Sequence, residues 1–176
     1  MADVNEISYL GDCITSDGTN TRNVQIRTKK GLGIICQIMK ILRTISFGSH
    51  SFDVALLLRE SYLINGILTN TEVSYHLATS ETGESDKVDR NFFQQLLSLP
   101  RSVPYPALYL DSGVIPISVL IKVRRLNYLH SIWKGPENGM LQQVFQVQWN
   151  FPSTGDWTIR LKMIYMTLKL RATWKT

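Results

Sequence analysis

The spacing of apolar residues divides the chain into a short extended segment followed by several helices. Near the N-terminus, Ile7, Tyr9 and Ile14 lie on either side of Gly11-Asp12, a pattern typical of two strands joined by a tight turn. Such a hairpin is only marginally stable by itself. We therefore expect it to pack against another element.

The segment after the hairpin repeats its apolar residues with the period of an α-helix. Asn20 or Thr21 can cap a helix that runs to about Leu42, because both side chains can accept a hydrogen bond from the first helical turn. One side of this helix is mostly apolar and is expected to face the core: Val24, Thr28, Gly31, Ile35, Ile38 and Leu42.

The rest of the chain predicts further helices. Residues 52–77 are apolar on most sides and predict a buried helix, with a break near Asn65-Gly66. Residues 79–86 are polar and predict a linker before a helix that Ser85 caps and Pro100 ends. A loop or short helix at 105–110 and helices at 117–134, 140–149 and 157–170 follow. The predicted fold class is therefore mainly α, with an N-terminal β-hairpin.

Length and composition exclude several classes of protein. The chain has 176 residues, of which 44% are hydrophobic and 19% charged, enough for a packed core. No apolar run is long enough to span a membrane, and no secretory signal is evident. Cys13 and Cys36 are isolated, which excludes a disulfide scaffold. We expect an intracellular protein, nuclear or cytoplasmic, with no membrane partner.

The distribution of charge is more informative than the net charge of +5. Between Gly18 and Phe52 there are six basic residues and no acidic one: Arg22, Arg27, Lys29, Lys30, Lys40 and Arg43. On a helical wheel, four of them lie opposite the apolar side, with Arg27 and Lys30 beside them. A basic helix face favours contact with nucleic-acid phosphates. An ordinary solvated helix face is the alternative interpretation.

The sequence predicts no catalytic, cofactor or metal site. A polymerase or nuclease that uses two metal ions needs converging carboxylates, and no Asp-Asp pair occurs here. The histidines are far apart, and Gly31-Leu32-Gly33 lacks the rest of a phosphate-binding loop. Cys36 lies among isoleucines, which predicts a buried, inert thiol. No small-molecule substrate is expected.

An ordered series of short motifs resembles one family. Ile7-Ser8-Tyr9-Leu10-Gly11-Asp12, followed by a basic helix, resembles the end of the palm in reverse transcriptases of non-LTR retrotransposons. The series continues with Asn65-Gly66-Ile67-Leu68, Ala107-Leu108-Tyr109-Leu110 and Arg124-Arg125-Leu126-Asn127. These later motifs are similar to the linker after the thumb in elements that carry a restriction-like endonuclease.

The resemblance implies a division of the chain and a role for each part. Residues 1–18 would be a primer-grip-like hairpin, 19–80 thumb-like helices, and 81–176 a helical linker region. Tyr9, Leu10 and Gly11 would position the primer terminus. The palm aspartates, the zinc knuckle and the endonuclease carboxylates of such elements have no counterpart in this sequence.

The chain is therefore interpreted as a fragment of an RNA-directed DNA polymerase, not an enzyme on its own. Its thumb-like helices would contact the backbone of a primer–template duplex, RNA–DNA or DNA, without sequence preference. Self-association through the exposed hairpin is a further expectation. The alternative is a helical protein–protein adaptor, in which the apolar helices at 52–77 and 117–134 form an interface or core.

Overall fold

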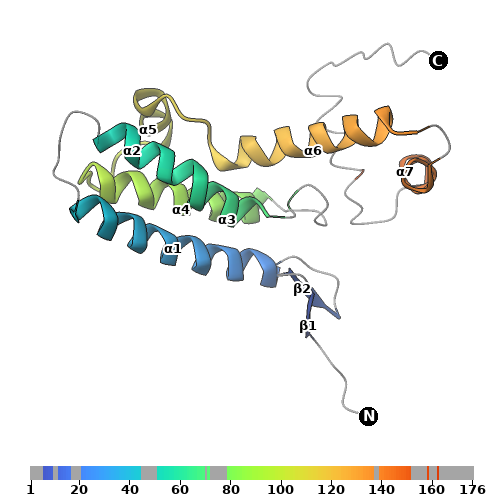
Figure 1. The fold of residues 1–176 in the computed structure, drawn as a ribbon, viewed down its shortest axis with the longest axis horizontal. Helices are drawn as coiled ribbons and strands as arrows, with labels where there is room; N and C mark the ends of the chain where they lie inside the picture. Colours follow the sequence, from blue (N-terminus) through green and yellow to red (C-terminus); the bar gives the residue numbers. More distant parts are fainter. Residues whose placement is uncertain are drawn as a thin grey trace. The chain divides into compact units, whose positions relative to one another are not determined.

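The computed structural model describes residues 6–9, 12–16, 21–44, 51–69, 71, 79–136, 139–151, 158 and 162. The fold is mainly α, with one N-terminal hairpin (Figure 1), as the apolar pattern predicts. The chain divides into two compact units. The first contains Met1–Asn70 and Leu77–Leu120, and the second contains Thr71–His76 and Ile121–Thr176.

The N-terminal hairpin is confirmed. Strand β1 (Glu6–Tyr9) pairs with β2 (Asp12–Thr15) in antiparallel register, with Ile7 opposite Ile14. Only two residues connect the strands, as expected for a tight hairpin. The hairpin is followed by helix α1 (Thr21–Thr44), which is long and amphipathic.

Helix α1 buries the side that its apolar period predicts. Val24, Gly31, Ile35, Ile38 and Leu42 are all buried, and Thr28 is half-buried. A Cβ at Gly31 would lie 2.9 Å from Val88 Cγ1 and 3.2 Å from Ile67 Cδ1. Glycine is therefore needed there, because α1 and its neighbours approach closely at this point.

The next apolar segment is one continuous helical rod with a π-helical centre. It consists of α2 (Ser51–Leu58), η1 (Arg59–Ile64) and α3 (Asn65–Leu68). The predicted break at Asn65-Gly66 is wrong, because Asn65 keeps helical φ and ψ of −63° and −38°. The rod ends at Thr69, where ψ is 127°. Of the expected extension to residue 77, residues 72–77 lie outside the described part.

Helix α4 (Thr79–Leu96) occupies the segment predicted to be a polar linker. Val88, Phe92 and Phe93 of the predicted helix are 2% exposed or less, as expected for its core side. The linker prediction fails because a distant segment contacts it: Ser118 N donates a hydrogen bond to Asp86 Oδ1 at 2.9 Å. Ser85 lies inside the helix and is not its cap.

The division into units differs from the one that the resemblance implies. Helix α4 and helix α5 (Tyr105–Ser112) belong to the first unit with α1, α2 and α3, although a boundary was expected near residue 80. The reason is packing: α4 supplies Val88 and Phe92 to the same core as α1. Figure 1 shows α4 running alongside α1.

Helix α6 (Ile117–Lys134) has the predicted bounds, and its residues from Ile121 onward belong to the second unit. Helix α7 (Met140–Asn150) follows. In the second unit, Leu129 and Ile132 of α6 form a small core with Phe145 of α7. Among the described residues, no single helix has the length and apolar content to span a membrane; α5 and α6, bent by 68°, meet that test only as a pair.

Candidate nucleic-acid interface

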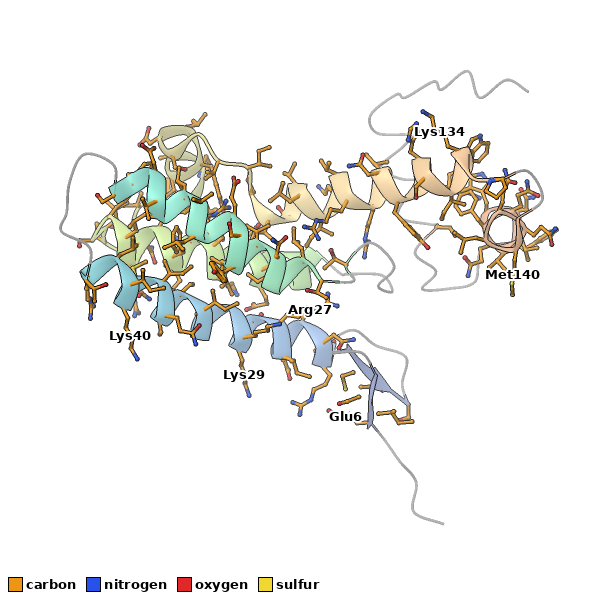
Figure 2. All side chains as sticks on the ribbon, viewed as in Figure 1. Glu6, Arg27, Lys29, Lys40, Lys134 and Met140 are labelled. Atoms are coloured by element: carbon orange, nitrogen blue, oxygen red, sulfur yellow. The ribbon has the colours of Figure 1, made fainter. Side chains whose placement is uncertain are left out.

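The basic side chains of α1 project from the surface on the side away from the core. Arg22, Lys29, Lys30, Lys40 and Arg43 are all exposed. Figure 2 shows Lys29 and Lys40 pointing away from α3 and α4. About three helical turns, or about 16 Å, separate these two lysines along the helix axis.

Helix α1 contains no acidic residue that could neutralise this face. Within the described part of the chain, none of Lys29, Lys30, Lys40 and Arg43 forms an ion pair. Arg43 lies in the last turn, where the helix dipole stabilises a positive charge. Lys29 and Lys40 have no such internal role, and their charges are directed into solvent. Lys30 is also exposed, but its side chain extends toward α3, where its Cε would lie 3.9 Å from a Cβ at Gly66.

Arg22 has a partner within the protein. Its Nε atom lies 3.3 Å from Glu6 Oε1, and both side chains are nearly half exposed. Hydrogen bonds from the Cys13 thiol and from Arg22 hold the pKa of Glu6 below its usual value. The pair links α1 to the hairpin, so Arg22 is the least available of the exposed basic residues for a phosphate.

Arg27 does not belong to the exposed basic face, and its assignment as a phosphate contact is corrected. Its side chain is only 8% exposed. On the helix it lies between Val24 and Gly31, on the side that packs against the other helices. Figure 2 shows it on the inner side of α1, whereas Lys29 points outward.

The side chain of Asn23 holds the hairpin against α1. Its Oδ1 atom accepts a hydrogen bond from Cys13 N at 2.5 Å, and its Nδ2 donates one to Cys13 O at 2.8 Å. The side chain of Asn23 thus satisfies both the N–H and the C=O of Cys13, as a neighbouring β-strand would do. Asn23 is a polar residue among the apolar positions of a helix, and this pattern is the signal in the sequence that could have identified it.

The primer-grip-like residues stay predictions. Tyr9 ends β1, but its side chain, together with Leu10 and Gly11, lies outside the described residues. Ile7 is 56% exposed on the hairpin. The expected self-association through this hairpin therefore has an apolar contact residue available, and it too stays a prediction.

The two cysteines differ in accessibility, and the prediction for Cys36 is wrong. Cys36 is exposed, because its position faces the basic side of α1 between Lys29 and Lys40 and not the isoleucines of the core. Cys13 is 2% exposed. Burial and a hydrogen bond to Glu6 raise the pKa of the Cys13 thiol. Cys36 is therefore the accessible thiol of the two.

Sequence reasoning also missed a buried ion pair that joins η1 to α4. Arg59 Nε and Nη2 donate to the two carboxylate oxygens of Asp89, each at 2.7 Å. Tyr109 donates to Asp89 Oδ2 at 3.1 Å, and Arg59 Nη2 also donates to Ile115 O at 3.4 Å. The guanidinium lies 5.4 Å from the ring centroid of Phe93. No short spacing in the sequence connects Arg59 to Asp89.

This group has the features of a structural cluster. Burial raises the pKa of Asp89, and the Arg59 guanidinium opposes that effect. Burial also raises the pKa values of Tyr105 and Tyr109, with a contribution from the nearby Asp86 and Asp89 carboxylates. Because every charge-bearing oxygen of Asp89 is used by a partner, the cluster stabilises the contact between η1, α4 and α5.

Among the described residues, no group of three or more His, Cys, Asp or Glu side chains converges as a metal site would. Comparison with protein-family models, with curated proteins and with solved structures found no match. The candidate site is therefore defined by geometry and charge alone: the exposed face of α1 formed by Lys29, Lys30, Lys40 and Arg43, called here the basic face.

Proposed function

We propose that the chain binds the backbone of a nucleic-acid duplex through the basic face of α1. The observation that carries the proposal is that one side of this helix is buried and apolar, whereas the opposite side is exposed and basic. Ile35, Ile38 and Leu42 anchor it to the core, and Lys29 and Lys40 extend from the opposite side. A helix that is fixed on one side can present its charges without reorganising.

The expected ligand is the phosphate backbone, bound without sequence preference. Lysine ammonium groups bind phosphates as point charges, and sequence is read in the grooves by side chains that match base edges. Within the described part of α1, the positions in line with Lys29 and Lys40 are Gly33 and Cys36, which are small and cannot reach deep into a groove. The longer exposed side chains of Leu32 and Gln37 lie to either side of that line. Contacts would therefore position the duplex and not select its sequence.

In this proposal the chain is the thumb-like and linker part of a retrotransposon reverse transcriptase, with no catalytic site of its own. What supports it is the order of motifs in the sequence together with a basic helix that follows a hairpin. The tie between Asn23 and Cys13 gives that hairpin a fixed position on α1. A primer terminus held by the hairpin and a duplex held by α1 would then be contacted by adjacent elements.

Cys36 offers a direct test because it lies within the basic face. Alkylation of its thiol is measured by mass spectrometry with and without an RNA–DNA hybrid at low salt, with the buried Cys13 as the internal reference. We expect the hybrid to slow alkylation of Cys36, and high salt to abolish the protection. An unchanged rate at a hybrid concentration that saturates binding would place the contact elsewhere. Absence of any binding at low salt would favour the adaptor function.

A further inference from the structure

The two edges of the N-terminal hairpin differ in how their backbone groups are used. On β2, the side chain of Asn23 bonds to Cys13 N at 2.5 Å and to Cys13 O at 2.8 Å. Both groups therefore point away from β1, so Cys13 and its partner Ser8 form a non-hydrogen-bonded pair of the ladder. Because the two kinds of pair alternate along an antiparallel ladder, Ile7 and Ile14 exchange the hydrogen bonds that join the strands.

The same alternation determines the outer edge of β1. Ser8, and Glu6 two residues before it, direct their N–H and C=O groups away from β2. Both residues are exposed, and within the described part of the chain no backbone group outside the hairpin bonds to either of them. Helix α1 contacts β2, which lies nearer to it than β1 does (Figure 1). Asn23 thus closes one edge of the hairpin and leaves the other, called here the β1 edge, exposed at Glu6 and Ser8.

A row of outward N–H and C=O groups is completed by another extended strand. A second copy of β1 fits the β1 edge in an antiparallel register centred on Ile7. By two-fold symmetry, Glu6 of each copy then lies opposite Ser8 of the other, and each of these pairs exchanges backbone hydrogen bonds. Ile7 meets its own counterpart in a non-hydrogen-bonded pair, where the side chains of two strands are closest.

Two observations favour a second copy as the occupant. Ile7 is 56% exposed, and this register covers it with an equal apolar side chain. The Glu6 carboxylate already lies 3.3 Å from Arg22 Nε of its own chain, so neither copy brings an unpaired acidic group to the contact. A register centred on Glu6 would set the two Glu6 side chains directly opposite each other, which like charges disfavour.

We propose that the β1 edges of two copies pair in the register centred on Ile7, which joins the two hairpins into one antiparallel sheet. Association stops at two copies, because Asn23 occupies the β2 edge of each hairpin and leaves no further edge for growth. The inference does not rest on the proposed nucleic-acid contact, since Lys29 and Lys40 lie on α1 and not on the hairpin.

Disulfide trapping in the full chain tests this register. In a Cys36→Ser background, Ile7→Cys places two introduced thiols opposite each other, with Cα atoms about 4.5 Å apart, a distance that a disulfide can span. The remaining Cys13 thiol is buried. The control is Ser16→Cys, an exposed position directly after β2, because the two β2 strands would lie about 14 Å apart in the joined sheet. Under mild oxidation we expect a disulfide-linked dimer of Ile7→Cys and only background cross-linking of Ser16→Cys. Equal yields in the two variants, or no dimer in either, would overturn the proposal.

A second measurement does not depend on introduced thiols. Ser8→Pro removes an N–H that would donate across the contact but that the hairpin itself does not use, and an edge strand accepts proline at such a position. Ser8→Ala keeps this N–H and is the matched control. Sedimentation equilibrium over a concentration series, under reducing conditions and without nucleic acid, gives the dissociation constant of the dimer. We expect Ser8→Ala to dimerise as the wild type does, and Ser8→Pro to raise the dissociation constant at least about tenfold.

High salt separates this association from any contact with phosphates. It screens the repulsion between two chains of net charge +5, so dimerisation should persist or strengthen, whereas phosphate contacts weaken as salt rises. Equal dissociation constants for Ser8→Pro and Ser8→Ala would contradict the proposed edge. A wild-type chain that stays monomeric throughout the series would contradict the dimer itself.

Discussion

Arg59 and Asp89 form a two-pronged hydrogen-bonded ion pair, with both bonds at 2.7 Å and both side chains 1% exposed or less. Thirty residues of sequence separate the partners. The pair fixes the π-helical segment η1 against α4, and these two elements contribute Leu63, Phe92 and Phe93 to the core beneath the basic helix.

Removal of either Arg59 or Asp89 alone is expected to destabilise the fold. Asp89→Ala leaves a buried guanidinium without its counter-charge, so we expect a loss of about 3–5 kcal/mol in the free energy of unfolding. Urea denaturation followed by circular dichroism measures it. The double variant Arg59→Met with Asp89→Leu removes both charges and should recover most of the loss. A double variant as unstable as Asp89→Ala would show that the charges themselves are required.

Two glycines of α1 should respond to alanine with opposite signs. A Cβ at Gly33 meets nothing within 4 Å, whereas at Gly31 it would lie 2.9 Å from Val88 Cγ1. Gly33→Ala should therefore raise the free energy of unfolding by about 1 kcal/mol, because alanine has the higher helix propensity. Gly31→Ala should lower it through the clash. Thermal melting of both variants checks the prediction, and a stabilising Gly31→Ala would contradict the packing described here.

The contact between Asn23 and Cys13 makes a prediction about the hairpin. Asn23→Ala leaves the buried backbone N–H and C=O of Cys13 without their partner, which should cost about 1–3 kcal/mol for each group left unsatisfied. Hydrogen exchange should show a selective loss of protection in β1 and β2. Gln25→Ala, on the exposed side of the same helix, is the control and should leave the hairpin protected. Equal loss in both variants would mean that Asn23 does not hold the hairpin.

The raised pKa values of Tyr105 and Tyr109 predict a loss of stability at alkaline pH. In the unfolded chain a tyrosine ionises near pH 10, whereas in the folded protein both remain protonated there. The two tyrosines therefore contribute fully to the free energy of unfolding below about pH 10, and this contribution is lost as the pH rises further. Between pH 8 and pH 11, the melting temperature of the wild type should fall further than that of Tyr105→Phe. A parallel fall in both would assign the pH dependence to other groups.

Much of the fold could be predicted because it depends on local pattern. The hairpin, α1 and α6 follow from apolar spacing and turn residues, and their bounds agree with the structure within a few residues. The start of α4 could not be predicted this way, because its polar first turns are held by contacts such as Ser118 N with Asp86 Oδ1, 32 residues away. Such contacts between distant segments leave no short motif.

The candidate site, too, could be predicted from the sequence only where it depends on local pattern. Helical periodicity places Lys29 and Lys40 on the outer side of α1 correctly. Arg27 lies near the boundary between the two sides, where packing of the neighbouring helices decides which side chain is covered. The prediction for Cys36 was wrong because it rested on the isoleucines beside it in the sequence, whereas helical periodicity places Cys36 on the same side as Lys29 and Lys40. The pair of Asn23 and Cys13 was not foreseen, because it depends on where the hairpin docks.

Charge reversal across a salt series tests the central claim, that the basic face binds the duplex backbone. Binding of an RNA–DNA hybrid is followed by fluorescence anisotropy for the wild type, for Lys29→Glu with Lys40→Glu, and for Lys122→Glu with Lys134→Glu. The last pair is exposed on α6 and changes the net charge equally. About four phosphate contacts predict a log–log salt slope near −3.6, which the α1 pair should flatten by about 1.8. The α6 pair should leave the slope near the wild-type value. Equal effects of the two pairs would mean that only net charge matters, and the basic face of α1 would not be the binding site.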